Sequence, residues 1–369
     1  MQVALIGFSK SGKTTVFNAL TGSEAEVSAF ATGKAQTHRA VVEVPDDRLD
    51  KLCKLYESKK LVHATIDYLD PVGIRRDLAG QGEGLGDDML HTIANADALV
   101  AVVRAFEDES GIDCDPEGDA EAIQMELILS DLTKVENRLE RVEAQAQRIG
   151  GKDRDRLIAE GDLLKRLKES LEAEKPIRAL EFTPDEDRLL RSFQFLTSKQ
   201  LILVLNMPEG EDGQDLAEAI EKSARECLGE DAGSAMPHIL ALCGETEMEI
   251  SRLDAEERTI FLEEYGIEQA GADRMIRMCY DALGLISFFT AGPTEAHAWT
   301  IEKGTPAVEA AGTIHSDLQR GFIRAQVVRW DDLLADGSTA EAKKNAHLRV
   351  EGKDYIVQDG DVIEIMFNV

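Results

Sequence analysis

Apolar residues along this chain gather in short runs that are separated by stretches with a helical period. Continuous apolar runs joined by helical crossovers are typical of a mostly parallel sheet that is buried on both faces. The runs occupy residues 2–6, 65–69, 99–103, 201–205 and 239–242, and a weaker run at 39–44 is compatible with an antiparallel edge strand. The pattern predicts an α/β fold.

A stretch of about ninety residues interrupts this pattern and carries a different period. Apolar residues are spaced alternately four and three apart at Ile128, Leu132, Val135, Leu139, Val142, Ala146 and Ile149. This is a heptad seam, and after Gly150-Gly151 a second helix repeats leucines seven apart at 157, 164 and 171. We expect an antiparallel helical hairpin, inserted as an arm into the sheet domain.

Beyond residue 283 the pattern changes again, to short strands and one helix. Strands are predicted at 286–289, 298–301, 323–328, 348–350, 355–357 and 362–367, with a helix at 306–314. Glycine- and aspartate-rich turns separate them. The predicted domains are therefore an α/β sheet domain at 1–120 and 200–283, an inserted coiled-coil arm at 121–199, and a small α+β domain at 284–369.

The chain has 369 residues and a formal net charge of −30, and such a surface repels nucleic acid at long range. The arm differs, because residues 134–178 hold twelve Lys or Arg against ten Asp or Glu, a net of +2. This is interpreted either as a solvated coiled-coil face or as a local contact for RNA. With no membrane span, no signal peptide and scattered cysteines, we expect a cytoplasmic protein, a monomer, and no contact with DNA or membrane.

Residues 7–14 read GFSKSGKT, which matches G-x-x-x-x-G-K-[ST] between an apolar run and a helical stretch. The glycines let main-chain N–H groups converge on phosphate oxygens, and the helix N-terminus adds partial positive charge. Lys13 is predicted to reach the β- and γ-phosphates, and the Thr14 hydroxyl to hold Mg²⁺. The nucleotide-binding residues predicted here are Gly7, Lys10, Ser11, Gly12, Lys13, Thr14 and Thr15.

A D-x-x-G motif follows the second apolar run, at residues 70–73. Asp70 is predicted to hold Mg²⁺, and the Gly73 amide to bond the γ-phosphate and to move when it leaves. The glycine-rich segment 80–86 is predicted to be a second mobile switch. Among threonines that could meet the metal from the first switch, Thr32 and Thr37 are candidates, with Thr37 preferred.

The nucleotide base is expected to be recognised after the fourth run, where residues 206–209 read NMPE. A guanine site usually shows N-K-x-D, but here Met207 replaces the Lys and Glu209 the Asp. Glu is one methylene longer, and loss of a bidentate contact of this kind costs about 1–3 kcal/mol of base discrimination. Asn206, Met207 and Glu209 are thus the predicted base-binding residues, together with Cys243 and Gly244 after the fifth run.

The residue that would orient the attacking water is not in its usual place. Ras-type enzymes carry Gln directly after D-x-x-G, whereas this chain has Ile74, which cannot hydrogen-bond through its side chain. Hydrolysis is therefore either slow or assisted by another group.

Together these residues resemble the YchF family of Obg-like ATPases over essentially the whole chain. The resemblance includes the GEGLG run at 82–86, VVRAFED at 102–108, the N-x-x-E motif, and in the C-terminal part FTAG at 289–292, AWTI at 298–301, GFIRA at 321–325 and EGKDYIV at 351–357. It implies a Ras-like P-loop domain, a coiled-coil insertion and a β-grasp TGS domain. It also implies hydrolysis of ATP in preference to GTP, and association with ribosomes.

Departures from the family pattern leave three points open. The family loop usually reads G-x-P-N-V-G-K-S, and its Asn helps hold potassium in related GTPases. Here residues 9–11 read SKS, and Lys10, at the Asn position, could place its own ammonium near the phosphates instead, so dependence on potassium is undecided. Ala101 occupies a position where family members often have His, so His38 and His91 become candidates for assisting the water. The first switch is hard to align.

We therefore expect a Mg²⁺-dependent ATPase that acts as a ribosome- or RNA-associated switch. Three alternatives remain at this point: a GTPase of the same fold, a nucleotide-binding interaction module with negligible turnover, and a small-molecule phosphotransferase. The pairing of D-x-x-G with N-x-x-E argues against the phosphotransferase.

Overall fold

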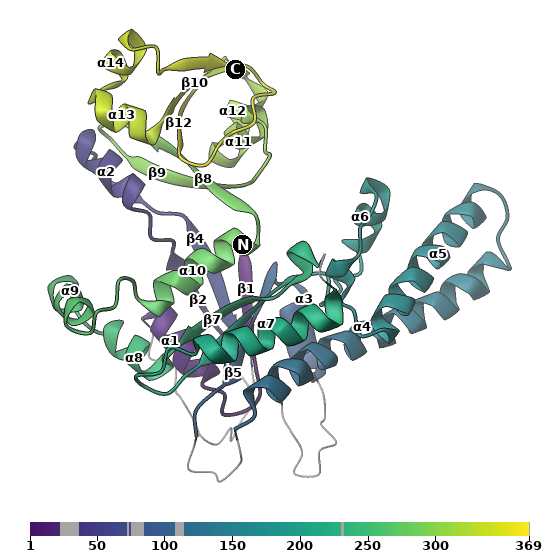
Figure 1. Cartoon of the computed structure of the whole chain (residues 1–369). Coiled ribbons are helices and arrows are strands. Elements are labelled where there is room, and N and C mark those ends of the chain that lie inside the picture. The colour runs from purple at the N-terminus through teal and green to yellow at the C-terminus, as the bar shows by residue number, and fades with distance from the viewer. Residues whose placement is uncertain (23–36, 72–73, 75–84, 108–113, 230–231, 369) are drawn as a thin grey trace. The chain divides into compact units, whose positions relative to one another are not determined.

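The computed structural model describes residues 1–22, 37–71, 74, 85–107, 114–229 and 232–368 (Figure 1). The chain divides into two units, the first formed by Met1–Ala40 with Asp67–Met275 and the second by Val41–Ile66 with Ile276–Val369. No helix in the described part of the chain combines the length and the apolar character needed to cross a membrane.

A six-stranded sheet forms the centre of the first unit, in the order β2-β4-β1-β5-β6-β7. β1 pairs in parallel with β4 and β5, and β6 pairs in parallel with β5 and β7, as the unbroken apolar runs predicted. The strands are β1 (Gln2–Ile6), β2 (His38–Glu43), β4 (Thr65–Asp70), β5 (Ala98–Arg104), β6 (Gln200–Asn206) and β7 (His238–Leu242). Because parallel strands end at one edge of a sheet, the loops after β1, β4, β6 and β7 meet there.

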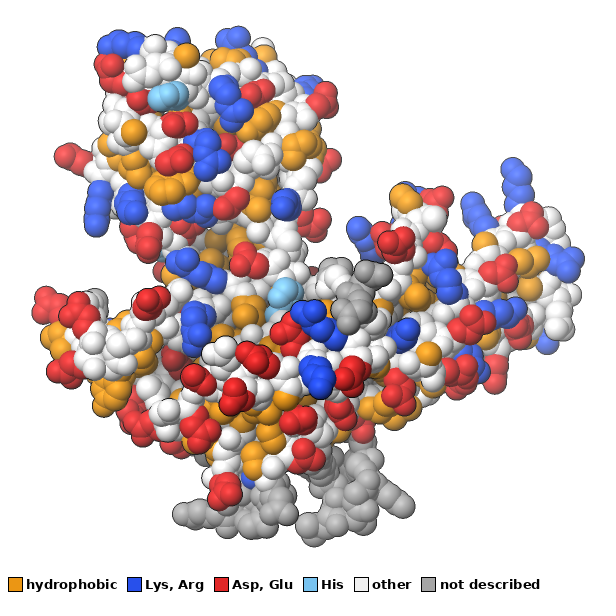
Figure 2. Space-filling view, in the orientation of Figure 1, with side chains coloured by type: hydrophobic (Ala, Val, Ile, Leu, Met, Phe, Trp, Pro, Cys, Tyr) orange, Lys and Arg blue, Asp and Glu red, His pale blue; other side chains and the backbone are white. Residues whose placement is uncertain are grey.

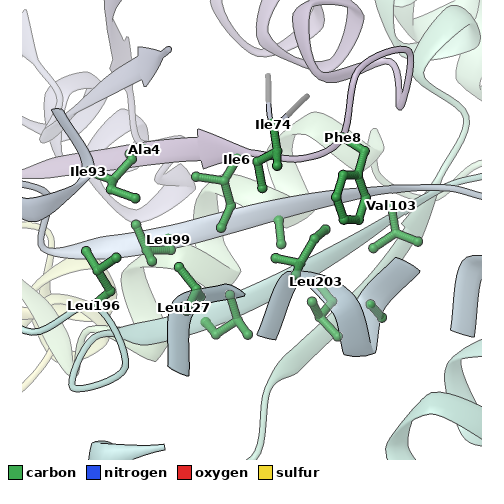
Figure 3. Packing of buried hydrophobic residues seen from close by; sticks show 14 of the residues in the cluster. Ala4, Ile6, Phe8, Ile74, Ile93, Leu99, Val103, Leu127, Leu196 and Leu203 are labelled. Carbon is green, nitrogen blue, oxygen red and sulfur yellow. The ribbon is translucent and has the colours of Figure 1, made fainter. Parts of the chain in front are cut away.

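Helices cover this sheet, and its core is continuous from strand to strand. The cluster in Figure 3 includes Ile6 and Phe8 at β1, Val103 on β5, and Leu203 on β6. The helices outside the arm are α1 (Lys13–Thr21), α3 (Asp87–Ala94), α7 (Gln214–Leu228), α8 (Gly244–Ile250), α9 (Ala255–Glu264) and α10 (Gly271–Ala282), with 3₁₀ turns at Ile177–Ala179 and Gly233–Ala235. Burial of β-strand side chains on both faces holds the loops at the sheet edge in fixed positions.

The arm consists of α4 (Pro116–Ala146) and α5 (Lys152–Glu172), followed by α6 (Pro184–Leu190). The heptad prediction is confirmed over most of its length, because Ile128, Val135 and Val142 are buried against α5 residues that include Leu164 and Leu171. The last predicted seam residue, Ile149, is 44% exposed and lies beyond the end of α4, so the seam stops one turn earlier than the spacing predicted. The visible face of the arm carries basic and acidic side chains intermixed (Figure 2).

The second unit contains a mixed sheet in the order β11-β10-β12-β8-β9-β3. Its elements are β3 (Leu61–Val62), β8 (Leu285–Ala291), β9 (Ala296–Glu302), α11 (Ala307–Ile314), α12 (Ser316–Arg320), β10 (Phe322–Arg329), α13 (Trp330–Asp336), α14 (Thr339–Lys344), β11 (Arg349–Glu351) and β12 (Asp361–Phe367). One sheet face packs on α11 through a core that includes Phe288, Ala311 and Val327. The strand predicted at 355–357 is wrong, since only an isolated bridge between Pro306 and Ile356 forms there. Helices α12, α13 and α14 were not predicted.

Residues 41–66 pack within the second unit, although the sequence pattern placed them in the α/β sheet domain. Their helix α2 (Asp47–Leu55) packs against β8, β9 and α13, and β3 pairs with β9. Arg48 donates to Asp359 Oδ2 over 2.6 Å, and its guanidinium lies 5.2 Å from the Phe289 ring centroid. A segment between β2 and β4 thus supplies part of the fold of the C-terminal region.

Candidate functional site

The loop between β1 and α1 adopts a conformation that requires glycine at two positions. Gly12 has φ +84° at the N-cap of α1, in the left-handed region that other residues rarely adopt. A Cβ on Gly7 would lie 2.6 Å from the carbonyl oxygen of Val102, so the loop passes directly over β5. Lys10 also has a positive φ, of 70°, and its side chain is exposed. This loop therefore presents its main chain at the N-terminus of α1, as the motif predicted.

Lys13, Thr14 and Asp70 converge where α1 begins and β4 ends. The Lys13 ammonium donates to Asp70 Oδ1 and to the carbonyl oxygen of Pro71, and the Thr14 hydroxyl donates to Asp70 Oδ2 over 3.1 Å. Lys13 is 7% and Asp70 3% exposed, so both charges are nearly removed from water. Burial lowers the pKa of Lys13 to about 7, and the Asp70 carboxylate in contact with it favours the charged ammonium. Thr14 and Lys13 precede Asp70 by 56 and 57 positions in the sequence, and the fold brings both side chains into contact with its carboxylate.

Asn206 connects the phosphate-binding loop to the loop after β7. Its Nδ2 donates to the carbonyl oxygen of Ser11 over 3.0 Å, and its Oδ1 accepts the Gly244 N–H over 2.9 Å. A Cβ on Gly12 would lie 2.0 Å from the same Nδ2, which is a second reason for glycine there. Sequence reasoning assigned Asn206 to the base, and it missed this bridging role because nothing in the linear pattern places residue 206 beside residue 11.

The other predicted base-binding residues differ in their exposure. Met207 is 6% exposed and belongs to the core cluster, and its main-chain N–H donates to Leu242 O over 2.8 Å. A Cβ on Gly213 would lie 2.9 Å from Met207 Sδ, so this side chain is tightly enclosed. Glu209 is exposed, and Cys243 is half-buried at the N-cap of α8. The carboxylate of Glu209 is therefore accessible, whereas the Met207 side chain is held inside the fold.

Ile74 belongs to the core and not to the solvent-facing part of the site. It is 2% exposed, its N–H donates to Gly7 O over 2.9 Å, and its carbonyl accepts the Ser9 N–H over 3.0 Å. This short parallel bridge fixes the residue after D-x-x-G against the phosphate-binding loop. Its apolar side chain is therefore buried and is not placed to orient an attacking water molecule. Gly73, Thr32 and the glycine-rich residues 80–84 lie outside the described residues.

Of the two histidines considered for assisting the water, only His38 lies near the Lys13–Asp70 pair. His38 Nδ1 is 3.7 Å from Asp70 Oδ2, and its ring centroid lies 6.2 Å from that of Phe17. His91 is an exposed residue of α3, and Ala101 is fully buried in β5. Thr37, the preferred switch threonine, is exposed and directly precedes β2. The start of β2 therefore brings Thr37 and His38 to the end of β4.

The residues present fit Mg²⁺ and a phosphate chain. A hydroxyl and a carboxylate are the oxygen ligands that Mg²⁺ prefers, and Thr14 and Asp70 already lie within 3.1 Å of each other. The Ser11 hydroxyl is buried, and among the described residues it has no hydrogen-bond partner. A donor of this kind beside a left-handed glycine and a helix N-terminus suits an anionic oxygen.

Two protein-family models match parts of this chain. Residues 2–145 match a family model described as a 50S ribosome-binding GTPase, and residues 285–368 match the model YchF-GTPase_C, described as a protein of unknown function. The chain is 42% identical to the ribosome-binding ATPase YchF of Bacillus subtilis, with all of both chains covered. The chain belongs to the YchF family.

Other members of the YchF family agree with this result. The ribosome-binding ATPase YchF of Escherichia coli O157:H7 is 36% identical over 99% of this chain and 98% of its own. The solved structure of the Schizosaccharomyces pombe YchF GTPase superposes with a TM-score of 0.82, at 27% identity over 99% of this chain and 97% of that one. The expected P-loop domain of the family, with its YchF-type C-terminal region, is confirmed.

Proposed function

We propose that this YchF-family protein is a Mg²⁺-dependent ATPase that converts ATP to ADP and phosphate and acts as a ribosome-associated switch in the cytoplasm. The observation that supports the proposal most strongly is the convergence of Lys13, Thr14 and Asp70 at the amino end of α1. The names of the bacterial relatives, which describe ribosome-binding ATPases, point the same way.

Lys13, Thr14 and Asp70 would contribute differently to the reaction according to their charge. Lys13 would carry positive charge to the β- and γ-phosphates, and Thr14 and Asp70 would hold Mg²⁺, which neutralises charge that develops during phosphoryl transfer. Lys13 now contacts the carboxylate that would hold the metal. Binding of the nucleotide with its metal therefore requires the Lys13 ammonium to separate from the Asp70 carboxylate. The start of β2, with Thr37 and His38, lies beside this carboxylate.

The proposed preference for ATP rests on the weakness of a guanine site. The buried Met207 cannot cover a base as a lysine stem would, and Glu209 is longer than the Asp of N-K-x-D. Adenine needs only main-chain hydrogen bonds and apolar contact, which the loop at Cys243 and Gly244 offers. Because one solved relative is named a GTPase, titration with both labelled nucleotides is the direct test, and preference for GTP would overturn this assignment.

A second function, nucleotide binding with negligible turnover, is favoured by one observation, the burial of Ile74 where a water-orienting residue is usual. Single-turnover hydrolysis measured with and without ribosomes separates the two. The ATPase proposal expects phosphate release without any acceptor molecule, and release that required an acceptor would indicate a phosphotransferase.

Replacement of Lys13 tests the site itself. Lys13→Ala is expected to abolish turnover, while Lys59→Ala, an exposed lysine of the second unit, is expected to leave it unchanged. Circular dichroism and the melting temperature show whether each variant is folded. Turnover that survived Lys13→Ala in a folded protein would show that the reaction occurs elsewhere.

A further inference from the structure

A pocket of about 220 Å³ opens in the first unit between α4 and α7. These two helices pack against each other, and Figure 1 shows α7 running alongside the first half of α4. None of the residues that line the pocket belongs to the phosphate-binding loop, to D-x-x-G or to the base-binding loops. The pocket is therefore separate from the nucleotide site described above.

The pocket has an apolar floor and an acidic rim. Ile128, Leu203 and Ile220 are each at most 5% exposed and form the floor. Glu117 and Glu121, one helical turn apart on α4, and Glu174, just after α5, are exposed and form the rim. We call this the Glu117–Glu121–Glu174 pocket.

The three rim carboxylates have no cationic partner among the described residues. Within the part of the chain that the structure describes, none of them forms an ion pair, and the Glu121 carboxylate accepts only a hydrogen bond from the Ser223 hydroxyl, over 2.9 Å. Three uncompensated carboxylates around one opening create a local negative potential. This potential favours a cation at the mouth and opposes a phosphate backbone.

The size of the pocket restricts its occupant. Sites for drug-sized ligands have volumes of roughly 300–1,000 Å³, so a pocket of about 220 Å³ suits one long side chain better than a small-molecule ligand. Arginine combines an apolar stem with a planar cation that pairs with carboxylates in a bidentate manner. It is also among the residues that contribute most to protein–protein binding energy.

We propose that the Glu117–Glu121–Glu174 pocket receives an arginine side chain from a basic segment of a partner protein. The stem would lie on Ile128, Leu203 and Ile220, and the guanidinium would meet the rim carboxylates. The inference deepens the proposed function and rests on it for the identity of the partner. On a ribosome, the contact at this pocket is with a basic ribosomal protein and not with RNA.

The backbone conformation of Glu174 allows a substitution that removes its carboxylate without destabilising the fold. Glu174 has φ +60°, at the position after the C-cap of α5 where glycine is usual. Glu174→Gly removes the rim carboxylate, and glycine adopts this positive φ without the steric cost that Glu has there. The variant is therefore expected to melt at the same temperature as the wild type or higher, while it binds a basic partner more weakly.

Cys227 provides a reporter inside the pocket. It lines the pocket on α7 and is exposed, whereas the other four cysteines are half-buried or buried, and none of the five, all of which the structure describes, forms a disulfide. Its reaction with a maleimide can be followed at residue resolution by peptide mass spectrometry. The probe is a ten-residue peptide with three arginines, and its control has citrulline, a neutral isostere, at the same positions.

We expect the arginine peptide to slow alkylation of Cys227 at least threefold at saturation, and the citrulline peptide to leave it unchanged. Glu117→Gln, Glu121→Gln and Glu174→Gln combined should weaken binding of the arginine peptide at least tenfold by calorimetry. The matched control combines Glu263→Gln, Glu264→Gln and Glu268→Gln, which removes the same charge from exposed positions of the same unit. Its affinity should stay within twofold of the wild type.

Equal losses in both triple variants would show that the peptide is attracted only by overall acidity, and would overturn the proposal. So would an unchanged alkylation rate at Cys227, or unaltered peptide affinity in folded Glu174→Gly.

Purified ribosomes then separate this inference from the proposed function. If the wild-type protein binds the arginine peptide but no ribosomes, the proposed function fails and the pocket stands. If ribosomes bind but leave Cys227 reactive and bind the rim triple variant equally well, the ribosomal role of the pocket is wrong.

Discussion

The side chain of Asn206 donates to the main-chain carbonyl of Ser11 across 3.0 Å, and so ties the end of β6 to the phosphate-binding loop. The other end of the same amide accepts the Gly244 N–H over 2.9 Å. One buried amide thus holds two loops that are expected to contact opposite ends of a nucleotide. The first residue of N-x-x-E acts here as a positioning residue.

Asn206→Ala is expected to weaken nucleotide affinity about tenfold or more, because it leaves the Ser11 carbonyl and the Gly244 N–H unpaired at about 1–3 kcal/mol each. Asn206→Asp keeps the acceptor for Gly244 but loses the donor to Ser11, so its affinity should be intermediate. Titration with a fluorescent nucleotide measures both variants. Wild-type affinity in Asn206→Ala would show that the loops keep their positions without this bridge.

Asp131 anchors α4 to the segment that leads into β6. It is fully buried, its Oδ1 accepts the Leu196 N–H over 2.9 Å, and its Oδ2 accepts the N–H and the hydroxyl of Thr197 over 2.7 and 2.8 Å. Asp131→Ala leaves these buried donors unpaired and is expected to lower the free energy of unfolding by about 3 kcal/mol.

Urea denaturation followed by circular dichroism measures this loss. The control is Glu140→Ala, an exposed position on the same helix, which should change the free energy of unfolding by less than about 0.5 kcal/mol. If Asp131→Ala were no less stable than this control, the three hydrogen bonds would not anchor the arm.

His347 and Asp336 form a pH-sensitive pair in the second unit. His347 Nδ1 lies 2.8 Å from Asp336 Oδ2, and this contact raises the pKa of His347 above its ordinary value near 6.5. Hydrogen bonds from the Asn345 side chain and from His347 lower the pKa of Asp336 below 3.8. The stabilisation from the histidine is complete below pH 6.5 and is lost as the pH rises through the folded-state pKa. The stabilisation from the aspartate is present above pH 3.8 and is lost as the pH falls through its lowered pKa.

An NMR titration of the His347 ring should therefore have its midpoint above 6.5 in the wild-type protein and nearer 6.5 in Asp336→Asn. The melting-temperature difference between wild type and His347→Gln should be largest near pH 5–6 and absent by pH 9. Identical His347 midpoints in the wild type and Asp336→Asn would contradict the ion pair.

The local structure of the predicted phosphate-binding loop could be foreseen from the sequence, whereas the contacts of the N-x-x-E motif could not. The residues of GFSKSGKT lie next to each other in sequence, so local turn geometry alone directs their N–H groups to one point. Met207 was predicted to lie at the base, but its side chain lies in the core, since burial of a flexible thioether outweighs its position in a four-residue motif. The bridge made by Asn206 joins residues 195 positions apart, and local patterning does not encode such a contact.

Sequence alone determined the strands of the parallel sheet and the two long helices of the arm, because hydrophobic period and turn residues are local properties of the chain. Only the tertiary structure decided that residues 41–66 pack with the C-terminal unit, that Ile74 is buried, and that an acidic-rimmed pocket lies between α4 and α7. These features arise where distant segments of the chain pack together. Whether a residue is buried there depends on which segment covers it, and not on its neighbours in sequence.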